Sequence, residues 1–157
     1  VRALWGVAQL ARLRSGRLAR GVARGLAAGP RAALAALDRR DACIAGVDAR
    51  LGDAAAWLLP VQARTAFPHA PTGAPVDVDG ARVPYDVACA VHVALASLTG
   101  HPALSVPVGF GPDGLPVGVQ LLGHRWDEPR LLAVARALEH GLGAHPPAPL
   151  PGLPGPD

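Results

Sequence analysis

The chain has 157 residues, half of them hydrophobic but only 4% aromatic, and a formal net charge of +3. This length suits one ordinary domain with a buried core and excludes two large ones. No apolar run approaches the roughly 20 residues of a membrane span, so we expect a soluble, cytoplasmic protein that does not bind a membrane. Cys43 and Cys89 form no CxxC pair, and we expect both to be small buried residues without a redox or zinc role.

The basic residues are all arginine, and they concentrate near the N-terminus. Residues 1–40 hold nine arginines and one acid, a net charge of +8, whereas residues 41–157 carry −5. Apolar residues at helical spacing over 10–26 predict an amphipathic helix, which its glycines weaken. Because no aromatic residues are interleaved with the arginines, a solvated face is favoured over nucleic-acid binding. The chain begins with Val1 and contains no methionine, so we expect it to be a piece of a longer protein.

The middle of the chain alternates helical patterns with breaks. Helical spacing over 31–51 stops at Gly52, and a short apolar run over 57–61 predicts a buried strand. Residues 68–84 have the proline and glycine content of a long surface loop, with a small turn over 76–80. Helical periodicity resumes over 85–99 as one helix, for which Gly100 is the expected C-terminal cap.

Two apolar runs, 104–110 and 115–123, are joined by Gly-Pro-Asp-Gly and predict an antiparallel hairpin. Both runs are apolar at nearly every position, so we expect strands buried on both faces of a larger sheet. Pro107 and Pro116 cannot donate to a ladder and should lie at strand ends, edges or bulges. A final helix is expected from Asp127 as its N-cap, with Pro129 close behind, and residues 146–157 form a Pro/Gly-rich tail.

The stretch TGHPALSVPVGFGPDGLPVGVQLLG, followed by DEPRLLAVARALE, resembles the C-terminal end of the amidase-signature enzymes. The resemblance implies an α/β fold, of which this chain is the C-terminal part: a mixed sheet covered by helices, incomplete here. Residues 1–145 then form that part of the amidase domain, with 1–52 helical and basic and 53–145 supplying strands, a substrate-side loop and the final helices. The matching residues are Thr99, Gly100, Pro102, Pro107, Val108, Gly109, Gly114, Leu115, Pro116, Gly118 and Gln120.

Family members resemble one another in cleaving carboxamides with a Ser, cis-Ser, Lys triad, in which a base activates a weak serine nucleophile. This chain has no lysine, and its serines Ser15, Ser97 and Ser105 are isolated, so no catalytic residue is assigned. The resemblance implies a hydrolase fragment that supplies sheet core and pocket wall, without a cofactor. Its expected partners are a small-molecule amide substrate and the N-terminal half of the amidase domain.

Two alternatives stay open. The chain could be a non-catalytic remnant or interaction module. Within the family, a general amidase and a transamidosome-type subunit that releases ammonia from glutamine are not separated, although the long loop slightly favours the former.

Five residues are candidates for the substrate pocket. Phe67 and His69 belong to the loop after the first strand, and Thr99 and His101 adjoin a helix end. Gln120 could contact a substrate, although satisfying neighbouring backbone is the favoured role.

Other chemistry is weakly supported. Cys89 and His92 share one helical face at i, i+3 but lack a clear third orienting group. The six histidines show no HExxH-like spacing, so no metal site is predicted.

Overall fold

The computed structural model describes residues 16–71 and 73–143, so the start of the predicted N-terminal helix and the Pro/Gly-rich tail lie outside the described residues. Helix α2 spans Gly16–Leu26 and helix α3 spans Pro30–Leu51. Proline is tolerated at the first position of α3 because its missing N–H would have no helical partner there. The helix ends as expected at Gly52, which has a φ of +48° that glycine adopts readily.

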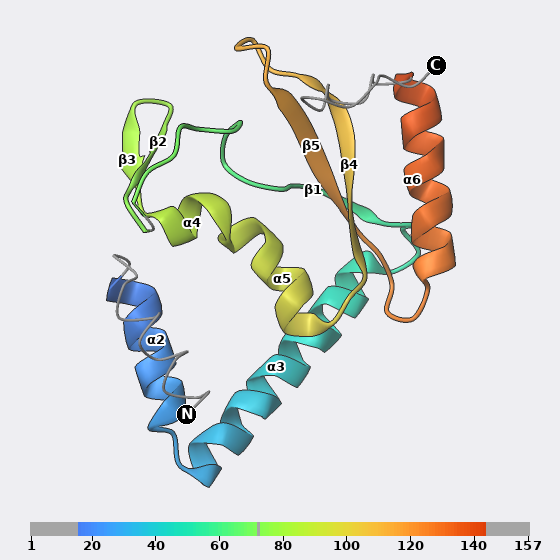
Figure 1. Ribbon diagram of the computed structural model, residues 1–157. Coiled ribbons are helices and arrows are strands. Elements are labelled where there is room, and N and C mark those ends of the chain that lie inside the picture. The colour runs from blue at the N-terminus through green and yellow to red at the C-terminus, as the bar shows by residue number, and fades with distance from the viewer. Residues whose placement is uncertain (1–15, 72, 144–157) are drawn as a thin grey trace, which may run out of the picture.

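A three-stranded antiparallel sheet forms the centre of the fold (Figure 1). Its strands are β1 (Trp57–Pro60), β4 (Ala103–Phe110) and β5 (Pro116–Leu122), in the order β1-β5-β4. Strand β5 therefore lies in the middle, and its register pairs Trp57 with Leu122 on one side and Val106 with Val119 on the other. The strands predicted on either side of Gly-Pro-Asp-Gly are confirmed, as is the strand after Gly52.

The β4–β5 connection has the geometry that its residues predict. The Gly111 N–H donates to the Leu115 carbonyl at 2.8 Å, and Gly114, with a φ of +72°, donates to the Gly111 carbonyl at 2.9 Å. Pro107 lies on an edge strand beside a bulge between Pro107 and Gly109, and Pro116 is the first residue of β5. Both prolines thus occupy positions where a missing N–H costs little.

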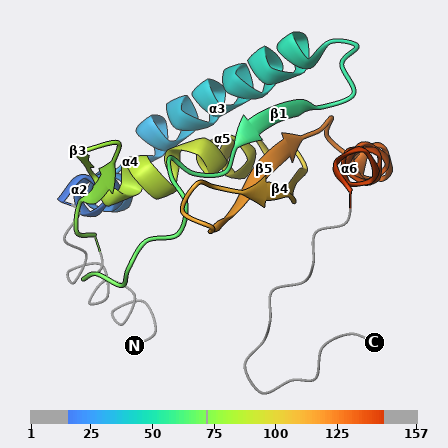
Figure 2. The same ribbon diagram turned by 90° about the horizontal axis from the view of Figure 1, so that it is seen from above.

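Helices pack on both faces of the sheet (Figure 2). Helix α6 (Glu128–Leu142) lies against β4 and β5, with Leu131 and Ala135 buried against Val106 and Leu121. On the other face, α3 and α5 (Val91–Thr99) pack over β1 and β5. The buried residues of that second cluster are Val47, Leu51 and Leu122.

The expectation that both strand runs are buried on both faces is wrong for β4. Ala103, Ser105 and Pro107 are exposed, while Leu104 and Val106 point into the α6 side. The reason is that each helical layer covers only two of the three strands. For the same reason Leu58 of β1, beyond the reach of α6, is 60% exposed.

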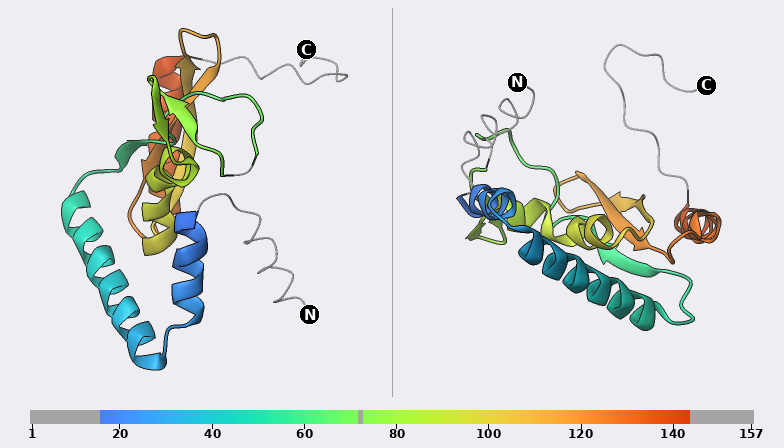
Figure 3. Two further views of the ribbon diagram at one scale, coloured as in Figure 1. Left: turned by 90° about the vertical axis from the view of Figure 1, so that its left-hand side faces the viewer. Right: turned by 90° about the horizontal axis from the view of Figure 1, so that it is seen from below.

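Only the second half of α3 contributes to the core. Its buried residues are Ile44, Val47 and Leu51, whereas Leu34 and Leu37 near its start are exposed. Figure 3 accordingly shows α2 and the first turns of α3 extending away from the sheet. This extension carries most of the described part of the basic N-terminal segment.

The helix expected over 85–99 is interrupted. It divides into α4 (Tyr85–Cys89) and α5 at Ala90, whose φ of −116° and ψ of −25° are not regular helical values. Gly100 caps α5 as predicted, with a φ of +72° and its N–H bonded to the Ala96 carbonyl at 2.9 Å.

The start of α6 also agrees with its prediction. Asp127 is the N-cap, and its carboxylate accepts a hydrogen bond from the Arg130 N–H at 3.3 Å. Such a cap satisfies one of the N–H groups that have no partner at a helix start.

The predicted long loop contains a hairpin of its own. Strands β2 (Val76–Val78) and β3 (Ala81–Val83) pair antiparallel around Asp79 and Gly80, both with positive φ. Asp-Gly is the sequence signal of such a two-residue turn, because both positions need left-handed backbone. The turn expected over 76–80 is therefore confirmed.

Candidate functional site

The loop that follows β1 crosses the sheet near the start of β5, and a cavity of about 400 Å³ lies between them. We call it the strand-end cavity. Its walls come from the loop, from the bulged half of the β4–β5 hairpin and from one exposed serine of β4. The lining residues are Val61, Gln62, Ala63, Arg64, Thr65, Ser105, Pro116, Val117 and Gly118.

Hydrogen bonds attach this loop to neighbouring elements. The Ala63 N–H donates to the Ala88 carbonyl at 3.0 Å, which ties the loop to α4. The Thr65 hydroxyl donates to the Asp113 carboxylate at 2.6 Å, which ties it to the β4–β5 turn. The Thr65 hydroxyl, and after it the Leu115 N–H, holds the pKa of Asp113 below its usual value, since both donate to the ionised form.

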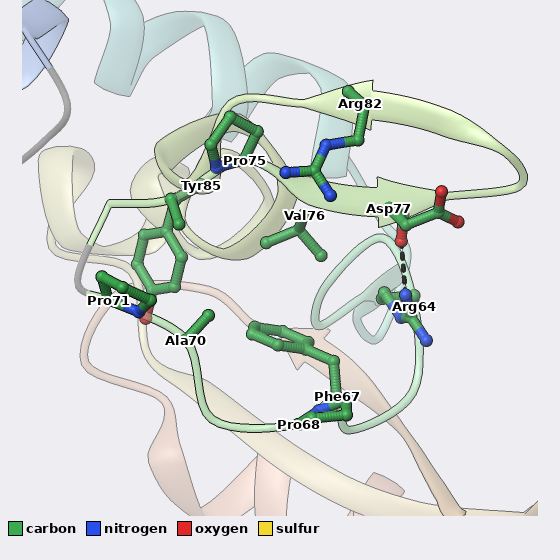
Figure 4. Close-up of a pocket in the computed structure, with 11 residues that line it drawn as sticks. Arg64, Phe67, Pro68, Ala70, Pro71, Pro75, Val76, Asp77, Arg82 and Tyr85 are labelled. Atoms are coloured by element: carbon green, nitrogen blue, oxygen red, sulfur yellow. Dashed lines mark hydrogen bonds between the residues drawn. The ribbon is translucent and has the colours of Figure 1, made fainter.

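A second, smaller cavity of about 200 Å³ lies between the same loop and the β2–β3 hairpin (Figure 4). We call it the hairpin cavity. Proline and aliphatic side chains form much of its wall, with two aromatic rings and two arginines among them. The lining residues are Arg64, Phe67, Pro68, Ala70, Pro71, Ala74, Pro75, Val76, Asp77, Arg82 and Tyr85.

Arg64 lines both cavities and is held in place by the hairpin. Its Nη1 donates to the Asp77 carbonyl at 2.6 Å, and its Cζ lies 5.9 Å from the centre of the Phe67 ring. Phe67 in turn meets Tyr85 edge to face, with 6.4 Å between ring centres. A guanidinium over an aromatic face is a favourable contact, so the loop, the hairpin and α4 fix one another.

The five predicted site residues fall into separate places. Phe67 lines the hairpin cavity, while His69, two residues on, is exposed and belongs to the lining of neither cavity. Gln120 is buried, and its Nε2 donates to the His92 carbonyl at 3.3 Å, which is the backbone-satisfying role favoured above.

Thr99 and His101 lie together in a buried network. The His101 ring approaches the Thr99 hydroxyl at 2.8 Å through Nδ1 and the Asp48 carboxylate at 3.0 Å through Nε2, and Thr99 donates to the Leu95 carbonyl at 2.8 Å. This network joins α3 to the end of α5 and lines neither cavity. Contact of these residues with a substrate stays a prediction.

The described residues provide cavities but no activated nucleophile. Ser105 faces the strand-end cavity, and no histidine or carboxylate of the described residues is hydrogen-bonded to its hydroxyl. Cys89 and His92 are separated by the break at Ala90, and burial raises the pKa of the Cys89 thiol, which disfavours the thiolate. Both cysteines are free and partly rather than fully buried, a small correction to their expected burial.

The described residues contain no group of three or more His, Cys, Asp or Glu side chains placed to hold a metal ion. Their helices are each too short or too polar to cross a bilayer.

The sequence analysis did not identify four residues that line the cavities or hold the loop between them. They are Arg64, Arg82, Thr65 and Asp113. Arg64 does carry a signal, because it is the one charged residue of a mostly apolar loop that directly follows a strand, where binding residues often lie. The Thr65–Asp113 bond joins positions far apart in the chain, and no local pattern announces it.

Comparisons with known proteins agree with this architecture. The model of the family described as Amidase matches residues 18–132. A solved amidase structure superimposes with a TM-score of 0.63 and 28% identity, covering 82% of this chain and 29% of that one.

Two relatives are named as a glutamyl-tRNA(Gln) amidotransferase subunit. The protein from Prosthecochloris aestuarii is 58% identical over 45 residues, which is 29% of this chain and 9% of the relative. The protein from Psychrobacter sp. is 38% identical over 81 residues, 51% of this chain and 16% of the relative. The chain thus matches only a small part of each relative's length. Because the family match spans well over half of its residues and the fold agrees, this chain belongs to the amidase family.

Proposed function

We propose that this chain is the C-terminal part of an enzyme that hydrolyses carboxamides, and that it supplies sheet core and one wall of the substrate pocket. One observation carries the proposal. The strand-end cavity is built on the Gly-Leu-Pro-x-Gly segment through which the chain resembles the amidases, yet no nucleophile with a base opens into it from the described residues. A pocket wall without its catalytic groups is expected of one part of a larger site.

The sheet supports the same proposal. The match to the solved amidase covers 29% of that protein, and β1 and β4 are both edge strands within the described residues. Unpaired edges and an exposed Leu58 beside one of them are features that a further strand or helix would cover. We propose the N-terminal half of the amidase domain as that partner.

A specific observation favours a second form of this function. The relatives cited above carry the name of an amidotransferase subunit, so a role in amide transfer within a complex is the second candidate. Both forms require cleavage of a carboxamide, and they differ in the acceptor of the released ammonia. A glutamine substrate would indicate the amidotransferase, and a simple amide the general amidase.

The proposal is tested by measuring ammonia release from glutamine, acetamide and benzamide. The 157-residue chain alone should release no ammonia above the blank. Co-expression with the polypeptide encoded immediately upstream and in frame should give a stable complex that releases ammonia from at least one of the three amides. The same complex with Ser97→Ala serves as a control and should keep its activity, because that hydroxyl bonds the Val93 carbonyl of its own helix and lines neither cavity.

Either of two results would overturn the proposal. Ammonia release by the chain alone would show that it contains its own catalytic groups. An upstream sequence that lacks both a lysine and a Gly/Ser-rich segment would instead favour the non-catalytic interaction module.

A further inference from the structure

The hairpin cavity combines features that no part of the proposed hydrolysis uses. Two guanidinium groups, those of Arg64 and Arg82, belong to its lining together with the rings of Phe67 and Tyr85. In Figure 4 the Phe67 and Tyr85 rings point into the space between the loop and the hairpin, and the Arg82 side chain extends over Val76. The cavity is thus apolar in its walls and cationic on its hairpin side.

The donors of both arginines are largely unused. Of the five N–H groups of Arg64, Nη1 bonds the Asp77 carbonyl, whereas Nε is buried without a hydrogen-bond partner among the described residues. Arg82 is exposed and makes no hydrogen bond or ion pair with another described residue.

The nearby carboxylates offset the two arginines only in part, although Asp77 lies directly opposite Arg82 in the β2–β3 register. Asp77 also lines the cavity, but its Oδ1 accepts from the Gly80 N–H at 3.2 Å, and Figure 4 shows the carboxylate turned toward that turn. Asp113, which feels the charge of Arg64, is held by Thr65 on the other side of the loop. With two arginines and one aspartate, the lining keeps a net positive charge for an anionic ligand.

We propose that the hairpin cavity binds a small aromatic carboxylate. Its carboxylate lies against the exposed Arg82 guanidinium, whose planar fork suits a carboxylate, and near the charge of Arg64, which also lines the cavity. Its ring lies against Phe67 and Tyr85, where aromatic pairs gain from edge or offset contacts. At about 200 Å³ the cavity is smaller than the pockets of drug-sized ligands, which favours a single ring over a nucleotide.

This proposal does not depend on amide hydrolysis. Every residue it uses belongs to the segment from Arg64 to Tyr85, so binding and catalysis can fail separately. An inactive chain that binds the carboxylate would support the site without supporting the enzyme.

Benzoate is the probe for the test. It is titrated into the 157-residue chain, and the Arg Nε–H signals are followed by NMR, with the Arg64 signal assigned through Arg64→Lys. We expect saturable shifts of the Arg64 signal. Binding of benzamide, which has the same shape without the charge, should be weaker by about tenfold or more, as should binding of acetate, which lacks the ring.

Charge-matched variants separate the site from nonspecific attraction. Arg64→Gln and Arg82→Gln should each weaken benzoate binding by about tenfold. Arg50→Gln removes the same charge from α3, where the side chain bonds its own helix at the Gly46 carbonyl, and should bind as the unmodified chain does. Because Arg82 is exposed, its variant should fold even if the Arg64 variant does not, and backbone amide signals report folding for both.

Three results would overturn the proposal. Equal binding of benzoate and benzamide would exclude a role for the charge. Equal binding by Arg82→Gln and the unmodified chain would exclude the paired arginines, and binding of inorganic phosphate as strong as that of benzoate would exclude selection by the aromatic wall.

Discussion

His101 is the most enclosed ionisable side chain of the described residues, and its contacts show how α5 is joined to the rest of the fold. The residue is 4% exposed and Thr99 is 1% exposed, and both ring nitrogens of His101 have partners. Buried polar groups arranged in this way hold a unique packing, because each loses its partner if the helix shifts.

Replacing His101 should therefore destabilise the chain. His101→Leu leaves the Thr99 hydroxyl and the Asp48 carboxylate without the ring, and we expect a loss of about 1–3 kcal/mol in the free energy of unfolding. Urea unfolding followed by circular dichroism measures this change.

Arg125→Gln is the matched control for the same network. Arg125 contacts Asp48 at 3.4 Å across an exposed surface, so its loss should cost less than about 1 kcal/mol. If both variants lost the same free energy of unfolding, the buried bonds of His101 would contribute no more to stability than the exposed contact of Arg125.

Gly123 is a second residue whose environment decides the effect of a substitution. A Cβ placed there would lie 3.1 Å from Leu131 Cδ1 and 3.2 Å from Leu131 Cβ, closer than ordinary contact. Gly123→Ala should push α6 from the sheet and cost about 1–3 kcal/mol. Thermal unfolding would detect the loss as a lower Tm.

Replacing a glycine of α6 with alanine should instead stabilise the folded chain. A Cβ on Gly141 would meet no atom within 4 Å, and alanine favours a helix over glycine by about 1 kcal/mol in its interior, less near an end. A lower Tm for Gly141→Ala would show that helix propensity does not govern this position.

Residues with local roles were the ones that could be predicted from sequence. Gly52, Gly100 and Asp127 act within one turn of helix, so the residue type and its neighbours suffice to indicate them. The partner of His101 could not be found in this way, because Asp48 lies on another helix and only the tertiary fold brings the two together.

At the scale of elements, the Thr65–Asp113 bond connects the loop after β1 with the β4–β5 turn. The pKa of Asp113 is lowered, first by the Thr65 hydroxyl and then by the Leu115 N–H. A carboxyl with a lowered folded pKa stabilises the folded state above its unfolded value of about 3.9, and that contribution is lost as pH falls through the lowered value.

Thr65→Val should move the pKa of Asp113 back toward its ordinary value. A pH titration of the Asp113 carboxyl by NMR measures this shift, and because Asp113 is exposed, the effect on overall stability should be small. Ser97→Ala, which removes a hydroxyl bonded only within α5, should leave the titration unchanged. An unshifted pKa in the Thr65 variant would mean that the hydroxyl does not bond the carboxylate in solution.

Helices and turns with strong local sequence signals were predicted correctly, but the break within the helix predicted over 85–99 was not. Gly-Pro-Asp-Gly indicated the β4–β5 turn, and Asp79-Gly80 indicated the smaller turn. The break at Ala90 leaves no such mark, since alanine is the best helix former. The cavities also have no local sequence signal, because their walls come from segments that lie apart in the chain.

At the scale of the whole molecule, each helical layer covers only part of the sheet, and neighbouring residues on one face differ sharply in burial. Leu58 and Leu121 are directly paired across β1 and β5, yet Leu58 is 60% exposed and Leu121 is 3% exposed. The difference arises because α6 covers β5 and does not extend to β1.

Leu121→Ala should cost about 2–5 kcal/mol through lost burial and the cavity it leaves. Leu58→Gln should change the free energy of unfolding of the isolated chain by less than about 0.5 kcal/mol. Urea unfolding of both variants tests this, and a large loss for Leu58→Gln would mean that its face is covered in the chain alone.

The fold class and the central hairpin followed from the sequence, whereas the extent of burial did not. Apolar runs indicate strands that some partner can cover, and they do not say whether that partner is in the same chain. Ser105 and Leu58 show this limit, because each lies on a strand whose second face is open here.

The pairing of Trp57 with Leu122 has a consequence for the order of folding. The β4–β5 hairpin closes through a short turn, and α6 follows it directly, so these elements need only local contacts that form within microseconds. Strand β1 must close a much longer stretch of chain before it can pair with β5, and such closure is entropically slow. Both cavities depend on the loop that β1 anchors, and they should therefore form in the last kinetic phase of folding.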